Sequence, residues 1–435
     1  SLSRTMKASR TMHPLLLGVL AAGALLTLTH TAQAQTAPAP APAAAASAPA
    51  GPTIRPELRS PLLDAQSLIA EKKYGLAKEK VQAANAVPNK TDYENYITAR
   101  VALAVANGED DAQSADKLVE QILQLNAGGG WLKPDETLPL MQAVGITHYR
   151  TKGYAQSASW LDRYVQAGGS DPSFKDARIR SHLLSGNLQR GSELLSEEIA
   201  ASEKAKTVPS QPYLEMLAQA RNNLKDVPGS TRALELLVQY YPSKDHWRAV
   251  INRLWARSDL ATRLQLDVFR LAFYTGTPEE TNDYTEYIDF AQKSGFSGEA
   301  LRAFDQGAAA GQLGTGANAE AHKKLRAKLA LENEQDRKTM AADIANALKK
   351  PDGSAALNVG LNLVGMQQFD KGLELMEKAI AKGIAKRPED ARLRLAVAYI
   401  QAGQTDKASQ ILATVSGPEG LTELVRYWTW AIRKP

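Results

Sequence analysis

Cysteine is absent from this 435-residue sequence. Its absence excludes disulfides, thiolate zinc sites, iron–sulfur clusters and cysteine nucleophiles. It also excludes a bacterial lipoprotein anchor, because that lipid is attached to a cysteine. The sequence likewise lacks an HExxH zinc motif, a GxSxG nucleophile elbow and a GxxxxGK[ST] phosphate loop. We therefore expect a protein that is not an enzyme and that holds no cofactor or metal.

Histidine is also scarce, with six in the chain. The four beyond the N-terminal region have no second ligand at helical spacing, which favours scattered helix histidines over a metal site. They are His148, His182, His246 and His322. Val, Ile and Thr never gather into the alternating runs that a strand needs, whereas the strong helix formers Ala, Leu, Gln, Glu and Lys abound. This composition predicts an all-α protein.

The N-terminus has the order of a secretory signal peptide. Lys7 and Arg10 precede an apolar stretch from Leu15 to Leu28, and Ala32 and Ala34 stand at the two positions that a signal peptidase reads. We predict a signal peptide over residues 1–34, cleaved after Ala34. The alternative is an uncleaved anchor, but the apolar stretch is shorter than the roughly 20 residues that span a bilayer. We therefore expect no integral membrane span after cleavage.

An Ala/Pro-rich linker follows over residues 35–57, reading TAPAPAPAAAASAPAGP at positions 36–52. Alternating Ala and Pro cannot continue a helix and favour an extended spacer, so we expect a disordered segment. A signal peptide followed by such a linker predicts a bacterial periplasmic protein without a lipid anchor. The formal charge is +5, and loss of the three leader cations Arg4, Lys7 and Arg10 would lower it to +2. This balance gives no reason to expect nucleic acid as a partner.

From residue 58 onward, helical segments alternate with turns rich in Gly, Pro and Asn. The clearest internal similarity lies near the C-terminus. Small and bulky residues recur there at offsets 0, 3, 9, 12, 16 and 19, at Gly360, Leu363, Phe369, Gly372, Met376 and Ala379. Thirty-six residues later, offsets 0, 3, 12 and 16 recur at Ala396, Tyr399, Ala408 and Leu412.

This pattern resembles the tetratricopeptide repeat, a helical hairpin of about 34 residues. Small residues at offsets 0 and 12 let two helix backbones approach closely, and bulky residues at offsets 3 and 9 fill the remaining space. Weaker copies occur earlier in the chain, for example from Ala65 to Ala84. We predict N-terminal repeats over residues 58–245, central hairpins over 246–315, and C-terminal repeats with a capping helix over 316–435.

The middle of the chain also resembles one particular family. The segments YYPSKDHWRAVINRL, DLATRLQLDVFRLAF and the closing YWTW are similar to those of a group of periplasmic tetratricopeptide-repeat proteins of Gram-negative bacteria. The resemblance covers roughly residues 60–435. It implies a tetratricopeptide-like α-solenoid, a superhelix of antiparallel helical hairpins.

The concave surface of such a solenoid usually binds an extended peptide or a helix of a partner. Arginine and aromatic side chains carry much of the energy of interfaces. The candidates near the centre are Trp247, Arg253, Arg257, Tyr284 and Tyr287. For the aromatic residues, the alternative interpretation is packing between repeats.

The function we predict is a non-catalytic scaffold or adaptor that binds a protein or peptide of the cell envelope. The alternative is an accessory or glycan-handling module of an envelope polysaccharide or cell-wall system. A charged stretch at residues 323–350 predicts a pair of amphipathic helices. Membrane-surface or nucleic-acid binding is an alternative for this stretch, but acidic residues interrupt its positive charge, which favours a solvated face.

Overall fold

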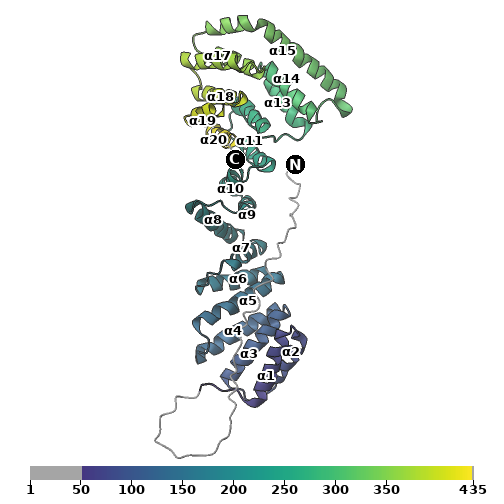
Figure 1. Cartoon of the computed structure of the whole chain (residues 1–435), viewed down its shortest axis with the longest axis vertical. Coiled ribbons are helices and arrows are strands. Elements are labelled where there is room, and N and C mark those ends of the chain that lie inside the picture. Colours follow the sequence, from purple (N-terminus) through teal and green to yellow (C-terminus); the bar gives the residue numbers. More distant parts are fainter. Residues whose placement is uncertain (1–50, 434–435) are drawn as a thin grey trace, which may run out of the picture. The chain divides into compact units, whose positions relative to one another are not determined.

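The computed structural model describes residues 51–433. The predicted signal peptide, with Ala32 and Ala34, and most of the Ala/Pro-rich linker lie outside the described residues. Within them the chain forms twenty α-helices, four short 3₁₀ segments and no strand (Figure 1). Successive helices pair as antiparallel hairpins in a solenoid-like arrangement, so the predicted fold class is confirmed. No described helix combines the length and the apolar character needed to cross a bilayer.

Within the described residues, the chain divides into two compact units, and the division follows Gly191. The domain boundaries at 245 and 315, which rest on sequence features, stay predictions. The described helices that lie within the first unit are α1 (Pro56–Ala70), α2 (Tyr74–Asn85), α3 (Asp92–Gly108), α4 (Ala112–Gly129), η1 (Pro134–Glu136), α5 (Thr137–Arg150), α6 (Tyr154–Gln166), η2 (Pro172–Phe174) and α7 (Lys175–Leu184). Helix α8 (Leu188–Lys204) contains the division between the units.

The first unit is a series of hairpins, α1–α2, α3–α4 and α5–α6, whose first helices α1, α3, α5 and α7 contact one another in sequence. Each helix places an apolar stripe in a shared core, which is how repeat hairpins bury surface that one hairpin alone would expose. Leu58, Tyr96, Ile122 and Leu161 are fully buried examples. The packing of each hairpin therefore depends on its neighbours.

The folded body begins where Arg55 contacts helix α3. The Arg55 backbone N–H and its Nε each donate to Glu94 Oε1 at 3.0 Å, and Nη2 donates to Oε2 at 3.0 Å. Glu94 also accepts from the backbone N–H of Thr91, whose side chain accepts from Glu94 N in return, a capping box at the start of α3. One buried carboxylate thus caps α3 and fixes the residue that precedes α1.

The Arg55–Glu94 contact predicts an acid-dependent loss of stability in the first unit. The hydrogen bonds from Arg55 lower the pKa of Glu94 to about 2. Because the unfolded pKa is about 4.3, this contribution is complete above that value and disappears as the pH falls toward the folded pKa. We expect Glu94→Gln to lower the unfolding midpoint at pH 6, with a difference from the wild type that shrinks by pH 3. A difference independent of pH in thermal unfolding would contradict this assignment.

The second unit contains the remaining helices. They are α9 (Gln211–Asn223), α10 (Val227–Tyr240), α11 (Lys244–Trp255), η3 (Thr262–Leu264), α12 (Gln265–Tyr274), α13 (Thr281–Lys293), α14 (Ser297–Ala309), η4 (Gly316–Asn318), α15 (Ala319–Leu348), α16 (Ser354–Gly365), α17 (Phe369–Lys382), α18 (Pro388–Gln401), α19 (Thr405–Leu412) and α20 (Leu421–Ala431). Hairpins pair as α9–α10, α13–α14, α16–α17 and α18–α19.

The glycines at offsets 0 and 12 lie at the crossing of α16 and α17, as their spacing predicts. A Cβ on Gly372 would come within 2.7 Å of Val364 Cγ2 and 2.9 Å of the Gly360 carbonyl oxygen. A Cβ on Gly360 would come within 2.6 Å of Met376 Cγ. The two backbones therefore approach at a distance that excludes any side chain at these positions.

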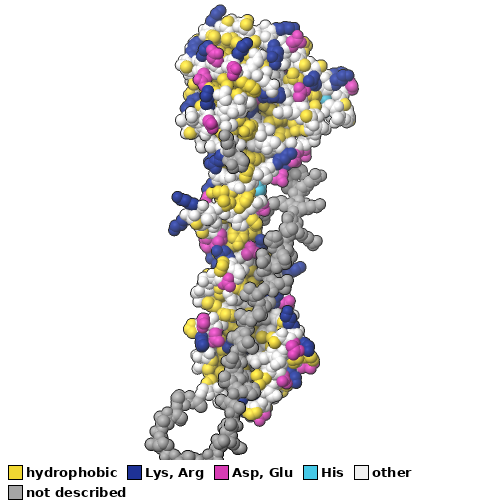
Figure 2. All heavy atoms as spheres, in the orientation of Figure 1, with side chains coloured by type: hydrophobic (Ala, Val, Ile, Leu, Met, Phe, Trp, Pro, Cys, Tyr) yellow, Lys and Arg dark blue, Asp and Glu magenta, His cyan; other side chains and the backbone are white. Residues whose placement is uncertain are grey.

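The charged stretch at 323–350 differs from the prediction, because most of it belongs to one helix, α15, of 30 residues. Only four of its side chains are buried: His322, Leu329, Met340 and Ala347. Its charges pair along the helix at i,i+4 spacing, as for Lys328–Glu332 and Lys338–Glu334. In the view of Figure 2, side chains of both signs are interspersed over the surface. This pattern is typical of a solvated helix face.

Helix α20 returns to the beginning of the second unit and packs against α12. Tyr427 Oη donates to Glu235 Oε1 on α10 at 2.8 Å, and Arg257 Nη1 donates to Glu423 Oε1 at 2.8 Å. A backbone bond joins Ala261 N to the Glu419 carbonyl oxygen at 3.2 Å. With α14 contacting α16 and α16 contacting α18, the helices of this unit close on themselves around a common interior.

Candidate functional site

The aromatic residues of the predicted groove lie in the core of the second unit. Trp247, Tyr284 and Tyr287 are 6%, 7% and 4% exposed. Tyr287 stacks on Phe269 and contacts Phe273, and Tyr284 meets Phe273 edge to face. This placement agrees with the alternative interpretation, packing between helices. Because these three side chains are buried, their exposure gives no support for direct contact with a partner.

The two predicted arginines bind other parts of the same unit. Arg253 Nη2 donates to Asn222 Oδ1 at 2.8 Å and to Ser230 Oγ at 3.0 Å. Arg257 binds Asp259 through Nε and Nη2 and binds Glu423 through Nη1. Their visible role is to tie α11 and the segment after it to α9, α10 and α20. The structure does not bring the five predicted residues together around one cavity.

A cavity of about 210 Å³ lies elsewhere in the second unit, between the η3–α12 segment, the end of α13, α16 and α18. Helices α16 and α18 are the first helices of consecutive hairpins and contact each other. The cavity is therefore on the side of the hairpins that faces the interior of the closed unit. Its lining residues are Thr262, Arg263, Leu266, Arg270, Phe290, Ser294, Phe296, Asn358 and Arg394.

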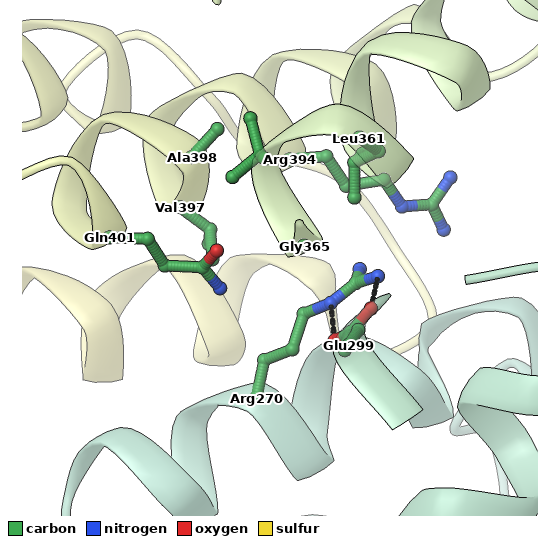
Figure 3. Close-up of a pocket in the computed structure, with 9 residues that line it drawn as sticks. Arg270, Glu299, Leu361, Gly365, Arg394, Val397, Ala398 and Gln401 are labelled. Atoms are coloured by element: carbon green, nitrogen blue, oxygen red, sulfur yellow. Dashed lines mark hydrogen bonds and ion pairs between the residues drawn. The ribbon is translucent and has the colours of Figure 1, made fainter. Parts of the chain in front are cut away.

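Arg270, from the middle of α12, is the most buried arginine of the cavity, with a side chain 2% exposed. Its Nε and Nη2 donate to the two oxygens of Glu299 at 2.7 and 2.9 Å, and Nη1 donates to Asp267 Oδ1 at 2.8 Å. Figure 3 shows this pair, with Arg394 and Leu361 nearby. The bidentate geometry fixes the guanidinium plane and holds α12 against the start of α14.

The other two arginines connect the same region to α18. Arg394 binds Asp267 Oδ2 through Nη2 at 3.2 Å and also donates to the backbone oxygen of Arg263 at 2.9 Å. Arg263 Nε donates to Asp390 Oδ2 at 2.6 Å. These contacts join residues 127 to 131 positions apart in the sequence. Each cavity arginine thus has a buried carboxylate as its partner.

Glu299 and Tyr287 keep their ordinary charge states at neutral pH. Burial by itself would raise the pKa of Glu299, but Arg270 outweighs it, and the pKa is lowered. Burial and the neighbouring Glu299 carboxylate raise the pKa of Tyr287 well above its usual value. Tyr287 is therefore neutral and donates its hydroxyl proton to Glu299 Oε1 at 2.5 Å. The Arg270–Glu299 pair is therefore ionic at neutral pH, and both Glu299 oxygens accept hydrogen bonds.

Several polar groups of the lining remain available to a ligand. Among the described residues, Arg394 Nη1 and Arg263 Nη2 make no hydrogen bond. Thr262, Ser294 and Asn358 are exposed. Their side chains make no hydrogen bond to the described part of the chain. No described set of three or more His, Asp or Glu side chains could hold a metal ion. The arrangement can bind a polar group, and it contains no evident pair of groups for acid–base chemistry.

The comparisons with known proteins give one family match, over part of the chain. Residues 363–423 match the model of the tetratricopeptide repeat family. This C-terminal segment is therefore similar to a tetratricopeptide repeat. The matched segment covers α17, α18 and α19, so the helix that presents Arg394 to the cavity lies within it.

A solved structure described as "Structure of Naa15/Naa10 bound to HypK-THB" also matches the chain. The match has 15% identity and a TM-score of 0.30 over 82% of this chain, and it spans 57% of the other chain, a little over half of its length. At this score the match does not establish one overall fold for the two proteins. A search of curated proteins found no match.

The cavity was not predicted from the sequence, although α12 carries a signal for it. Asp267 and Arg270 stand at i,i+3 within QLDVFRLAF, a segment that is otherwise almost wholly apolar. Charged residues within a buried helix are seldom placed there without a partner. The sequence therefore indicated a buried ionic contact, but not its partners, because Glu299 and Arg394 come from other hairpins.

Proposed function

We propose that this protein is a non-catalytic scaffold of the bacterial periplasm that binds a protein or peptide of the cell envelope. The binding surface is the mouth of the cavity, where α16 and α18 face the η3–α12 segment. Tetratricopeptide hairpins present their first helices as a surface for a peptide or a helix. The periplasmic location rests on the predicted signal peptide, on the Ala/Pro-rich linker that follows it and on the resemblance to a periplasmic family.

The observation that carries the proposal is the open cavity against the first helices of consecutive repeat hairpins. Asn358 of α16 and Thr262 of η3 are exposed at this cavity, and their side chains make no hydrogen bond within the described residues. A partner segment laid across the mouth can bond with these groups and insert one side chain below them. Interfaces gain most of their energy from such a side chain in a pocket.

Site-specific photocrosslinking tests the proposal. A crosslinkable residue at position 358 should capture a defined protein in intact cells, and the purified partner should then bind the chain in solution. Asn358→Trp, which fills the mouth, should weaken that binding at least tenfold. Asn346→Trp, on the exposed face of α15, is the matched control and should leave it unchanged. Equal affinity for both variants and the wild type would contradict a partner at this surface.

Fractionation tests the location separately. The tagged chain should appear in the periplasmic fraction, shortened by the predicted leader, and Ala34→Arg should block that processing. A chain that keeps its full length in the cytoplasmic fraction would overturn the proposed location without bearing on the binding surface.

A further inference from the structure

We infer that the cavity of the second unit binds a neutral sugar, one ring of which enters between α12, α16 and α18. This inference goes beyond the scaffold function, because it assigns a ligand that requires no protein partner. It gives a site to the glycan-handling alternative, which the sequence raised without one. The reasons are the charge balance, the unused hydrogen-bonding groups, the apolar wall and the size of the cavity.

The charge balance decides between a neutral ligand and an anion. Each cavity arginine pairs with a carboxylate: Arg263 with Asp390, Arg270 with Glu299 and Arg394 with Asp267. All three carboxylates are buried, so little net charge faces the cavity. An anion bound to Arg394 Nη1 and Arg263 Nη2 would lie beside these buried carboxylates, and it would lose its hydration without gaining an unpaired cation, at a cost in desolvation. A neutral ligand leaves the pairs in place and uses only the donors that they do not occupy.

The unused groups match hydroxyl chemistry. Arg394 Nη1 and Arg263 Nη2 are donors, whereas the Thr262 and Ser294 hydroxyls and the Asn358 amide can both donate and accept. Sugar hydroxyls also donate and accept, so one ring can bond with groups of both kinds. The two arginine donors lie on η3 and α18. The hydroxyl and amide groups, which both donate and accept, lie on η3, α16 and the end of α13. An anion with acceptors only would leave the acceptor capacity of Thr262, Ser294 and Asn358 unused.

The apolar part of the lining suits the C–H face of a ring. Leu266 and Phe296 are buried in the wall, and Phe290 is half-buried beside them. One face of Phe296 is already covered by the Arg270 guanidinium, 5.3 Å from the ring centroid. Phe290 packs on Phe269 at 5.3 Å and is the more accessible ring. Phe290 is therefore the aromatic side chain expected to contact the sugar.

The size of the cavity sets the number of rings. Pockets for drug-sized ligands start at about 300 Å³, and this cavity measures about 210 Å³. A second void, lined by Arg270 and Arg394 among others, measures only about 10 Å³ and adds no room for a second ring. One ring fits within the cavity, and a longer glycan would continue outward past Asn358.

Ligand-detected NMR with the purified full chain tests this assignment, using glucose, galactose and N-acetylglucosamine as neutral probes and glucose 6-phosphate and inorganic phosphate as anionic ones. We expect saturable binding of at least one neutral sugar. Asn358→Trp should weaken it at least tenfold, and Asn346→Trp should leave it unchanged. Anionic probes should bind at least tenfold more weakly than that sugar.

Three outcomes would overturn the sugar site: no binding of any neutral probe, tighter binding of the anions, or binding that survives Asn358→Trp. Circular dichroism and thermal unfolding of both variants show whether they are folded. Because Asn358 is exposed and makes no side-chain hydrogen bond within the described residues, folding of the variant should be unaffected. Failure here leaves the crosslinking result intact, so the sugar site and the scaffold function can be judged separately.

Discussion

Replacing Arg270 by methionine should destabilise the second unit by about 3–5 kcal/mol. The change leaves Glu299 buried without its bidentate partner and leaves Asp267 with Arg394 alone. Methionine fills much of the arginine volume, so the expected loss is mainly that of an uncompensated buried carboxylate and not of a cavity. Urea unfolding of the wild type and the variant at neutral pH measures the difference.

The pH dependence separates this cause from a packing defect. In the variant, burial raises the pKa of Glu299, so the carboxyl group takes up a proton as the pH falls and its penalty disappears. In the wild type the pKa of Glu299 is lowered. The stabilisation by its charged form is therefore lost at low pH. Both effects shrink the difference between variant and wild type on acidification. A difference that stays constant from pH 7 to pH 4 would contradict the electrostatic explanation.

A double variant is the matched control. Arg270→Met combined with Glu299→Gln removes the buried charge and keeps a group that can accept the Tyr287 hydroxyl proton. We expect it to be more stable at neutral pH than Arg270→Met alone, because a neutral amide costs less to bury than an unpaired carboxylate. A double variant that is less stable than Arg270→Met would show that the Glu299 carboxylate stabilises the fold by contacts other than its pairing with Arg270.

Truncating Trp428 to alanine should also cost about 3–5 kcal/mol. Trp428 is 1% exposed and is the largest fully buried side chain in the described part of the chain. It lies on α20 and contacts Tyr274 of α12, with the ring centroids 5.2 Å apart. Its loss should weaken the contact between α20 and α12 more than the packing of the other helices of the second unit.

Hydrogen exchange resolves where Trp428→Ala acts. Amides of α20 and α12 should lose protection first, and those of α16 and α17 last. Tyr427→Phe is the control on the same helix, because it removes only the hydrogen bond to Glu235 and should cost about 1 kcal/mol. Uniform loss of protection across the unit would show that α20 is part of one cooperative core.

Local sequence patterns predicted much of the fold because they report local physics. The glycines at positions 360 and 372 predicted a close helix crossing, since a Cβ at either position collides with the opposing helix. The stretch at 323–350 was predicted less well. Its Glu and Lys residues support helix formation throughout, so one helix continued through most of a segment in which two were expected.

The candidate site was harder to predict, because aromatic residues that fill the space between hairpins look the same in sequence as residues that bind a partner. Trp247 and Tyr287 were predicted at a groove and instead lie in the core. Arg394 was not predicted as a site residue, although α18 places it against Asp267, 127 positions away. Sequence spacing carries no information about such a pair when the helices lie in different hairpins.

For this protein, the sequence by itself determined the all-α class, the hairpin repeat near the C-terminus and the absence of cysteine chemistry. Each of these depends on composition or on spacing within one hairpin. The tertiary structure alone decided the closure of α20 on α12, the pairing of three arginines with buried carboxylates, and the cavity between them. Those features depend on how the hairpins stack, and stacking brings together residues that no local pattern relates.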